Sequence, residues 1–140
     1  MAHALEADIV DFYGEAVLQV SADRDGNLIA DSVAIARELS AASGLIDGKL
    51  WTAGALVPAP APEIVKKWCV DIALYELSTG PAYTDEKRQR YEDALAALNR
   101  IADGKDRYAW FAPIAAAIDP TPVLFSAAQR VFSRTTLADW

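Results

Sequence analysis

Apolar residues recur at helical spacing along most of the chain and predict five helices. Two short amphipathic segments, residues 5–13 and 15–20, precede three longer ones at residues 32–51, 62–78 and 84–103. Apolar side chains at every third or fourth position gather on one face of a helix, and that face is expected to meet a core. The pattern therefore predicts an all-α fold of two short and three longer helices.

The segment 62–78 is predicted to be the central helix of this fold. Its apolar residues surround the helix almost completely, so neighbouring helices are expected to bury it. Only Lys67, Asp71 and Ser78 form a narrow strip that we expect to face water. The charged residues within the segment make it too polar to cross a bilayer.

The ends of the longer helices carry local signals. Asp31 or Ser32 is a suitable N-cap for the helix that follows, as is Thr84 or Asp85, and Gly104 suits the position after a helix C-terminus. Small residues in the segment 32–51 lower its helix propensity and predict the close approach of another helix; they are Ser40, Ser43, Gly44 and Gly48. The charge run at residues 85–90 is predicted to be a solvated face.

After residue 104 the helical pattern ends. Tyr108, Trp110 and Phe111 precede a proline-containing linker, and residues 123–125 and 130–134 are β-prone. We therefore expect a helical domain at residues 1–104 and, at residues 105–140, a linker and an interaction arm that is extended or forms a β-hairpin. An isolated hairpin is barely stable in water, so the arm needs a surface to lie against. The predicted partner-binding residues are Phe125, Arg130, Val131, Phe132, Ser133, Arg134, Leu137 and Trp140.

Length and charge restrict the class of protein. The 140 residues are enough for one domain, and their net charge of −7 opposes stable binding to the phosphates of nucleic acid. Acidic residues concentrate before residue 51, whereas residues 121–140 carry Arg130 and Arg134 against Asp139 alone. This asymmetry favours head-to-tail contact between copies or contact with an acidic partner. No secretory signal is expected, and a reducing, cytoplasmic compartment is favoured.

The inventory of reactive residues does not predict an enzyme, a cofactor or a metal. The single cysteine, Cys69, is expected to be a small buried residue, and His3 an inert part of a mobile lead-in at residues 1–5. Among the carboxylates, Asp71 is the strongest candidate for a functional residue, but a structural ion pair with Lys67, one turn earlier, is favoured. The cluster at residues 23–27 lacks the acidic twelfth position of a calcium loop, so a solvated turn is favoured there.

Several short motifs occur in an order that resembles the Mu-type phage head–tail connector family, long catalogued as a family of unknown function. The motifs are Tyr13-Gly14, Asp23–Gly26, Ile46-Asp47-Gly48, Cys69–Ala73, Arg90–Leu95 and Arg130–Arg134. The resemblance implies a virion-neck protein that assembles as a ring of about a dozen copies beneath the portal. The implied partners are the portal protein, neighbouring copies and the next neck or tail-completion protein, while double-stranded DNA passes through without specific binding. The implied locations are the virion neck and, during assembly, the host cytoplasm.

Two other classes remain open from the residues alone. One is a small cytoplasmic binding or regulatory protein whose arm docks a soluble partner, and the other is an enzyme with an unrecognised carboxylate site. A size measurement with the partner present separates the first from a connector, which joins a ring-shaped complex. For the second, Asp71→Asn is the test, because it would abolish activity without unfolding the protein.

Overall fold

The computed structural model describes residues 2–23, 26–27, 29–78 and 80–113, and most of these residues are helical. The elements in chain order are α1 (Glu6–Tyr13), α2 (Glu15–Ala22), α3 (Ser32–Thr52), β1 (Ala55–Leu56), α4 (Glu63–Leu77), the 3-10 turn η1 (Gly80–Ala82), α5 (Asp85–Ala102) and β2 (Ala112–Pro113). The predicted all-α fold is confirmed, and every predicted helix boundary lies within two residues of the observed one.

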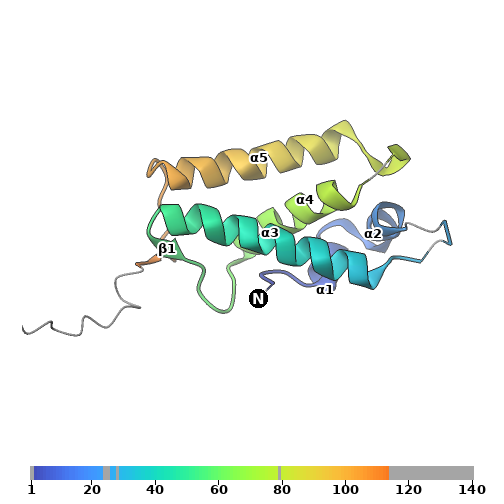
Figure 1. Cartoon of the computed structure of the whole chain (residues 1–140), viewed down its shortest axis with the longest axis horizontal. Coiled ribbons are helices and arrows are strands. Elements are labelled where there is room, and N and C mark those ends of the chain that lie inside the picture. Colours follow the sequence, from blue (N-terminus) through green and yellow to red (C-terminus); the bar gives the residue numbers. More distant parts are fainter. Residues whose placement is uncertain (1, 24–25, 28, 79, 114–140) are drawn as a thin grey trace, which may run out of the picture.

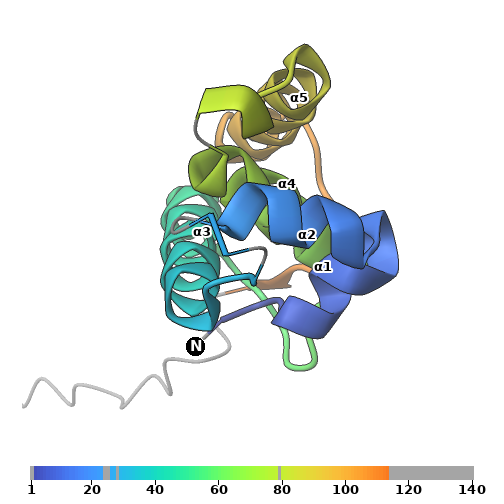
Figure 2. The ribbon, with the colours of Figure 1, turned by 90° about the vertical axis from the view of Figure 1, so that its right-hand side faces the viewer.

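Helix α4 lies at the centre of the bundle, as predicted. Figure 1 shows α3 and α5 running along it, and Figure 2, turned by 90°, shows α1 and α2 covering a further side. Side chains from all five helices meet around α4, and its own contribution to the core is the largest. The buried apolar residues of α4 are Val65, Trp68, Cys69, Val70, Ile72, Ala73, Leu74 and Leu77.

The polar strip predicted to face water on α4 is wrong at two of its three positions. Asp71 and Ser78 are only 6% and 8% exposed, whereas Lys67 is exposed. The two buried groups are tolerated because each has a hydrogen-bond partner. Ser78 Oγ donates to the carbonyl oxygen of Leu74 at 2.6 Å, and Asp71 accepts a hydrogen bond from Tyr13.

The predicted helix ends are confirmed. Asp31 is the N-cap of α3, where its Oδ1 accepts from the backbone N–H groups of Val33 and Ala34 at 3.0 and 3.2 Å. Thr84 is the N-cap of α5, and Gly104 follows that helix with φ at +72°, in the left-handed region that favours glycine. These local signals determine where the chain enters and leaves its longest helices.

The predicted close approach of a helix to the small residues of α3 is wrong for the two glycines. A Cβ added to Gly44 or Gly48 would meet nothing within 4 Å, because both lie on the exposed side of α3. Ser43 is the small residue that faces the core, and its Oγ lies 3.3 Å from Sγ of Cys69 on α4. Cys69 is buried, and burial raises the pKa of its thiol, so its predicted role as a small core residue is confirmed.

The N-terminal lead-in is held against α3, which corrects the expectation of a mobile segment. The backbone N–H of His3 donates to Ser43 Oγ at 2.9 Å, and His3 Nε2 lies 2.7 Å from Asp47 Oδ1. Ala4 beside it is 1% exposed. The segment before α1 therefore contributes to the core and to one face of α3.

Residues 105–113 lie against the helical body. The Tyr108 ring packs edge-on against Trp68 of α4 at a centroid distance of 5.8 Å, and it stacks with Trp110 at 5.7 Å. Strand β2 then pairs antiparallel with β1, with Ala55 opposite Pro113. The predicted division at residue 104 stays a prediction, and the predicted partner-binding residues, from Phe125 to Trp140, lie outside the described residues.

Candidate functional site

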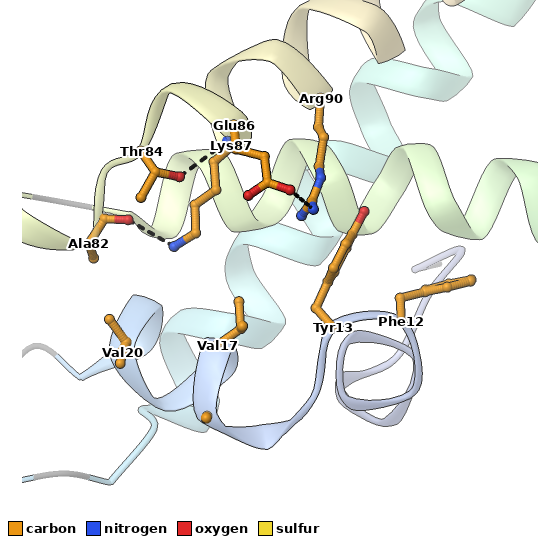
Figure 3. A pocket seen from close by; sticks show the side chains of 10 residues that line it. Phe12, Tyr13, Val17, Val20, Ala82, Thr84, Glu86, Lys87 and Arg90 are labelled. Atoms are coloured by element: carbon orange, nitrogen blue, oxygen red, sulfur yellow. Dashed lines mark hydrogen bonds and ion pairs between the residues drawn. The ribbon is translucent and has the colours of Figure 1, made fainter.

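A groove lies between the first two helices and the start of α5. We call it the α2–α5 groove; its volume is about 560 Å³, and Figure 3 shows its lining side chains. Most of its surface is apolar, with polar groups along the α5 side. The lining residues are Phe12, Tyr13, Ala16, Val17, Val20, Ala82, Thr84, Glu86, Lys87 and Arg90.

The apolar wall of the groove comes from the outer face of α2. Leu18, Ser21 and Ala22 of this helix face the core, whereas Ala16 and Val20, four residues apart, share the outer face. Val20 is 63% exposed, and Figure 3 shows Val17 and Val20 side by side on the groove. Helix α2 is thus apolar on two sides, of which the bundle covers only one.

Lys87 closes one end of the groove with a network of partly buried hydrogen bonds. Its Nζ donates to Ser21 Oγ at 2.8 Å, to Ser78 Oγ at 2.9 Å and to the carbonyl oxygen of Ala82 at 2.8 Å. An ammonium group has three donors, so these neutral acceptors use all of them. Burial lowers the pKa of Lys87, and the nearby charge of Arg90 lowers it further.

The other end of the groove is formed by Tyr13 and Arg90. The Tyr13 hydroxyl donates to Asp71 Oδ1, and the Arg90 guanidinium carbon lies 4.4 Å from the centroid of the Tyr13 ring. Glu86, one turn earlier on α5, forms an ion pair with Arg90. Figure 3 shows this stack of acid, guanidinium and ring along the groove's edge. The charge run at residues 85–90 is therefore not simply a solvated face, because Lys87 and Arg90 both build the site.

Asp71 serves as the buried acceptor for Tyr13. Burial raises the pKa of the Asp71 carboxyl, while the Tyr13 hydrogen bond and the charges of Lys67 and Arg90 act in the opposite direction. Burial also raises the pKa of Tyr13, as does its bond to Asp71. The predicted ion pair of Asp71 with Lys67 does not form as a direct contact between these described residues: Tyr13 is the hydrogen-bond partner, and Lys67 acts on the carboxylate through its charge.

The sequence predicts the arm as a binding segment, but it does not predict the groove. All the predicted partner-binding residues lie beyond residue 113, and the groove was not predicted at all. Its one sequence signal is the composition of α2, where Ala16, Val17, Leu18 and Val20 are apolar on more than one face of an eight-residue helix. Lys87 gives no signal, because its acceptors come from α2, α4 and η1.

Within residues 2–23, 26–27, 29–78 and 80–113, no group of three histidine, cysteine, aspartate or glutamate side chains could hold a metal ion.

The turn after α2 is held by Asp23, whose Oδ1 accepts from the backbone N–H groups of Gly26 and Asn27 at 2.8 and 3.1 Å. The helices of these same ranges include none with the length and apolar character that a membrane crossing requires.

Fold and groove together define a small, acidic, all-α protein with an open apolar surface beside its first two helices. The chain belongs to the phage protein family described as Bacteriophage Mu, Gp36, whose sequence profile matches residues 3–109. The expected membership of a phage family is thereby confirmed. The match covers the helical body and ends before Arg130–Arg134, the tail motif of the predicted resemblance. No curated protein matches the sequence.

Proposed function

We propose that this protein is a structural head–tail connector of a tailed phage or prophage. It assembles as a ring beneath the portal, docks on the portal through its C-terminal arm, has the next neck or tail-completion protein as a further partner, and has no enzymatic role or cofactor. The observation that carries the proposal is the match of residues 3–109 to a phage protein family. Its site of action is the virion neck, after a period in the host cytoplasm.

The charge of the chain supports a place around a DNA channel. The net charge of −7 repels the phosphates of a passing duplex and discourages it from sticking. Exposed acids are distributed over several helices of the body, among them Asp11, Glu15, Asp47 and Glu92. A neck protein needs this property because the genome must move past it in both packaging and ejection.

The attachment of residues 105–113 to the body and the composition of the residues that follow support a docking role for the arm. Tyr108 packs on Trp68, Trp110 stacks on Tyr108, and β2 pairs with β1, so the chain is held to the body up to Pro113. The remaining residues include Phe125, Phe132 and Trp140, large apolar side chains of the kind that anchor protein interfaces.

Deletion of Ser126–Trp140 tests the proposal. The shortened chain is expected to keep the helical circular dichroism and thermal midpoint of the full chain, because the deletion lies beyond the described body. Assembly onto portal-bearing heads, seen by electron microscopy, is expected to be lost. Within the arm, R130A/R134A is expected to weaken assembly, and T135A/T136A serves as its matched control. Normal necks built from the shortened chain would contradict the proposal.

A further inference from the structure

We propose that the α2–α5 groove receives part of the C-terminal segment, residues 114–140, of a second copy of this chain, while the rest of that segment remains available to dock on the portal. The inference rests on the proposed ring and gives it a specific contact between neighbours. The copies would then associate head to tail, each using its groove for one neighbour and its arm for the other.

The chemistry of the groove favours an apolar occupant. Lys87 uses its three donors within the protein, and the Arg90 guanidinium is paired with Glu86 and stacked on Tyr13. The polar groups of the edge therefore have partners already. What remains open is the apolar wall of Ala16 and Val20, and a volume of about 560 Å³ is enough for several side chains.

Residues 114–140 have the composition that such a groove requires. They contain Phe125, Val131, Phe132, Leu137 and Trp140, and they carry two arginines and two aspartates. The whole net charge of −7 therefore lies in residues 1–113. Two acidic bodies repel each other on approach, whereas a neutral, apolar segment does not, and its arginines can meet Glu86 at the rim of the groove.

The groove and the point where the described chain ends, at β2, lie at opposite ends of the bundle, and this points to contact between copies. The described chain ends at β2, beside the C-terminal ends of α3 and α5, whereas the groove lies beside α2 and the N-terminal end of α5 (Figure 1). Helix α5 has 18 residues and is about 27 Å long. In a ring of more than two copies, each interface joins one surface of a copy to a different surface of its neighbour. An arm at one end and a receiving groove at the other meet this requirement.

The length of the arm and the polar outer face of α5 also favour binding of the arm in a neighbour's groove over binding in the groove of its own chain. Twenty-seven extended residues span at most about 90 Å, so the arm can cross to an adjacent body. To fill its own groove it would have to return along α5, whose outer face exposes Arg88, Glu92 and Asn99 and offers little apolar surface.

Disulfide cross-linking between separately purified full-length chains tests the inference. One chain carries Ala16→Cys on the groove wall, and the other carries Phe125→Cys, Val131→Cys or Leu137→Cys in the arm. Cys69 stays in place because it is buried. The control replaces Ala16→Cys by Ala41→Cys, the same substitution at an exposed position of α3 outside the groove. We expect at least one arm position to give about tenfold more mixed dimer with the groove cysteine than with the control.

A second pair of variants tests the role of the apolar wall. Val20→Lys, in the chain that carries the groove cysteine, is expected to reduce the mixed dimer severalfold, because it places a charged ammonium group in the wall where apolar contact is proposed. Val33→Lys changes another exposed valine, on α3 outside the groove, and is expected to have no effect. Equal cross-linking to the groove and control cysteines would overturn the inference. So would cross-links that form only within one chain carrying both cysteines, at a concentration too low for association.

The outcomes separate this inference from the connector proposal. Mixed dimers that depend on the groove, together with normal necks after deletion of Ser126–Trp140, would overturn the connector and keep the contact between copies. Loss of necks after that deletion, together with no preference for the groove cysteine, would overturn the contact and keep the connector.

Discussion

At the scale of single residues, the structure depends on polar groups that are buried with their partners. Tyr13, Asp71 and Arg90 join α1, α4 and α5 through one hydrogen bond and one cation–π contact. Lys87 joins α2, α4, η1 and α5 through three more hydrogen bonds. Removal of one of these side chains leaves its partner without a hydrogen bond inside the protein. Small substitutions at these positions are therefore expected to lower the stability more than their size suggests.

Tyr13→Phe removes the donor to the buried Asp71 carboxylate and nothing else. A hydrogen bond to a charged group contributes about 1.5–3 kcal/mol, so we expect a loss of that order in the free energy of unfolding. Urea denaturation measures it. In an Asp71→Asn background the loss should fall to about 1 kcal/mol, because the acceptor is then neutral. Equal losses in the two backgrounds would show that the hydroxyl does not act through Asp71.

Asp71→Asn tests the cost of burying the carboxylate. Burial raises the pKa of Asp71 above its ordinary value of 3.8, although Tyr13, Lys67 and Arg90 oppose the rise. Just above pH 3.8 the folded state therefore binds more protons than the unfolded state, and its stability falls as the pH rises. The amide has no such titration and still offers an oxygen to Tyr13.

The expected result is a gain in stability of the Asp71→Asn variant relative to the natural chain as the pH rises from about 4 to about 7. Denaturation at a series of pH values measures it. Asp11→Asn, at an exposed position of α1, removes a carboxylate without that burial and serves as the control. If the curves of the natural chain and the Asp71 variant run parallel over this range, burial of Asp71 has no energetic cost.

At the scale of elements, the helices were predictable because their signals are local. The apolar spacing of residues 32–51 and 84–103 and the caps Asp31, Thr84 and Gly104 require no knowledge of the tertiary structure. The burial of Asp71 and the groove could not be predicted in this way. Both depend on α1 and α2 covering α4, and Gly14, with φ at +85°, turns the chain between those two helices.

Two glycines of the long helices respond in opposite ways to the same substitution. Gly104→Ala places a Cβ on a residue with φ at +72°, which costs about 1–2 kcal/mol. Gly44→Ala lies inside α3 where the added carbon meets nothing within 4 Å, and it should stabilise the helix by about 0.5–1 kcal/mol. Thermal or urea unfolding of both variants measures the difference. A loss of stability at Gly44 would show that α3 is packed there after all.

At the scale of the whole molecule, the fold has two unlike ends. One end holds the groove, and the other holds the paired strands from which the chain continues. The sequence predicted an arm that needs a surface, because apolar side chains near a terminus are visible in the sequence. It could not predict the groove that we propose as the receiving surface, since Ala16 and Val20 come to line one groove with Ala82 and Arg90 only in the folded bundle.

The acidic charge of the molecule predicts how it meets DNA. A duplex should not be retained by the purified chain even at low salt, because few phosphates can be neutralised by a protein of net charge −7. Electrophoretic mobility at about 20 mM and about 150 mM salt measures this. Tight binding that weakens steeply between these concentrations would contradict the charge argument and favour a DNA-binding role.

The pairing of Ala55–Leu56 with Ala112–Pro113 has a mechanical consequence. A pull on the chain beyond residue 113 is first borne by this short ladder, by the packing of Tyr108 on Trp68 and by the stacking of Trp110 on Tyr108. Tension is thus delivered to the connection between α3 and α4 and to the central helix, while the last turn of α5 is spared. In the connector that we propose, tension on the chain beyond residue 113 would therefore reach β1 and α4 before it reaches α5.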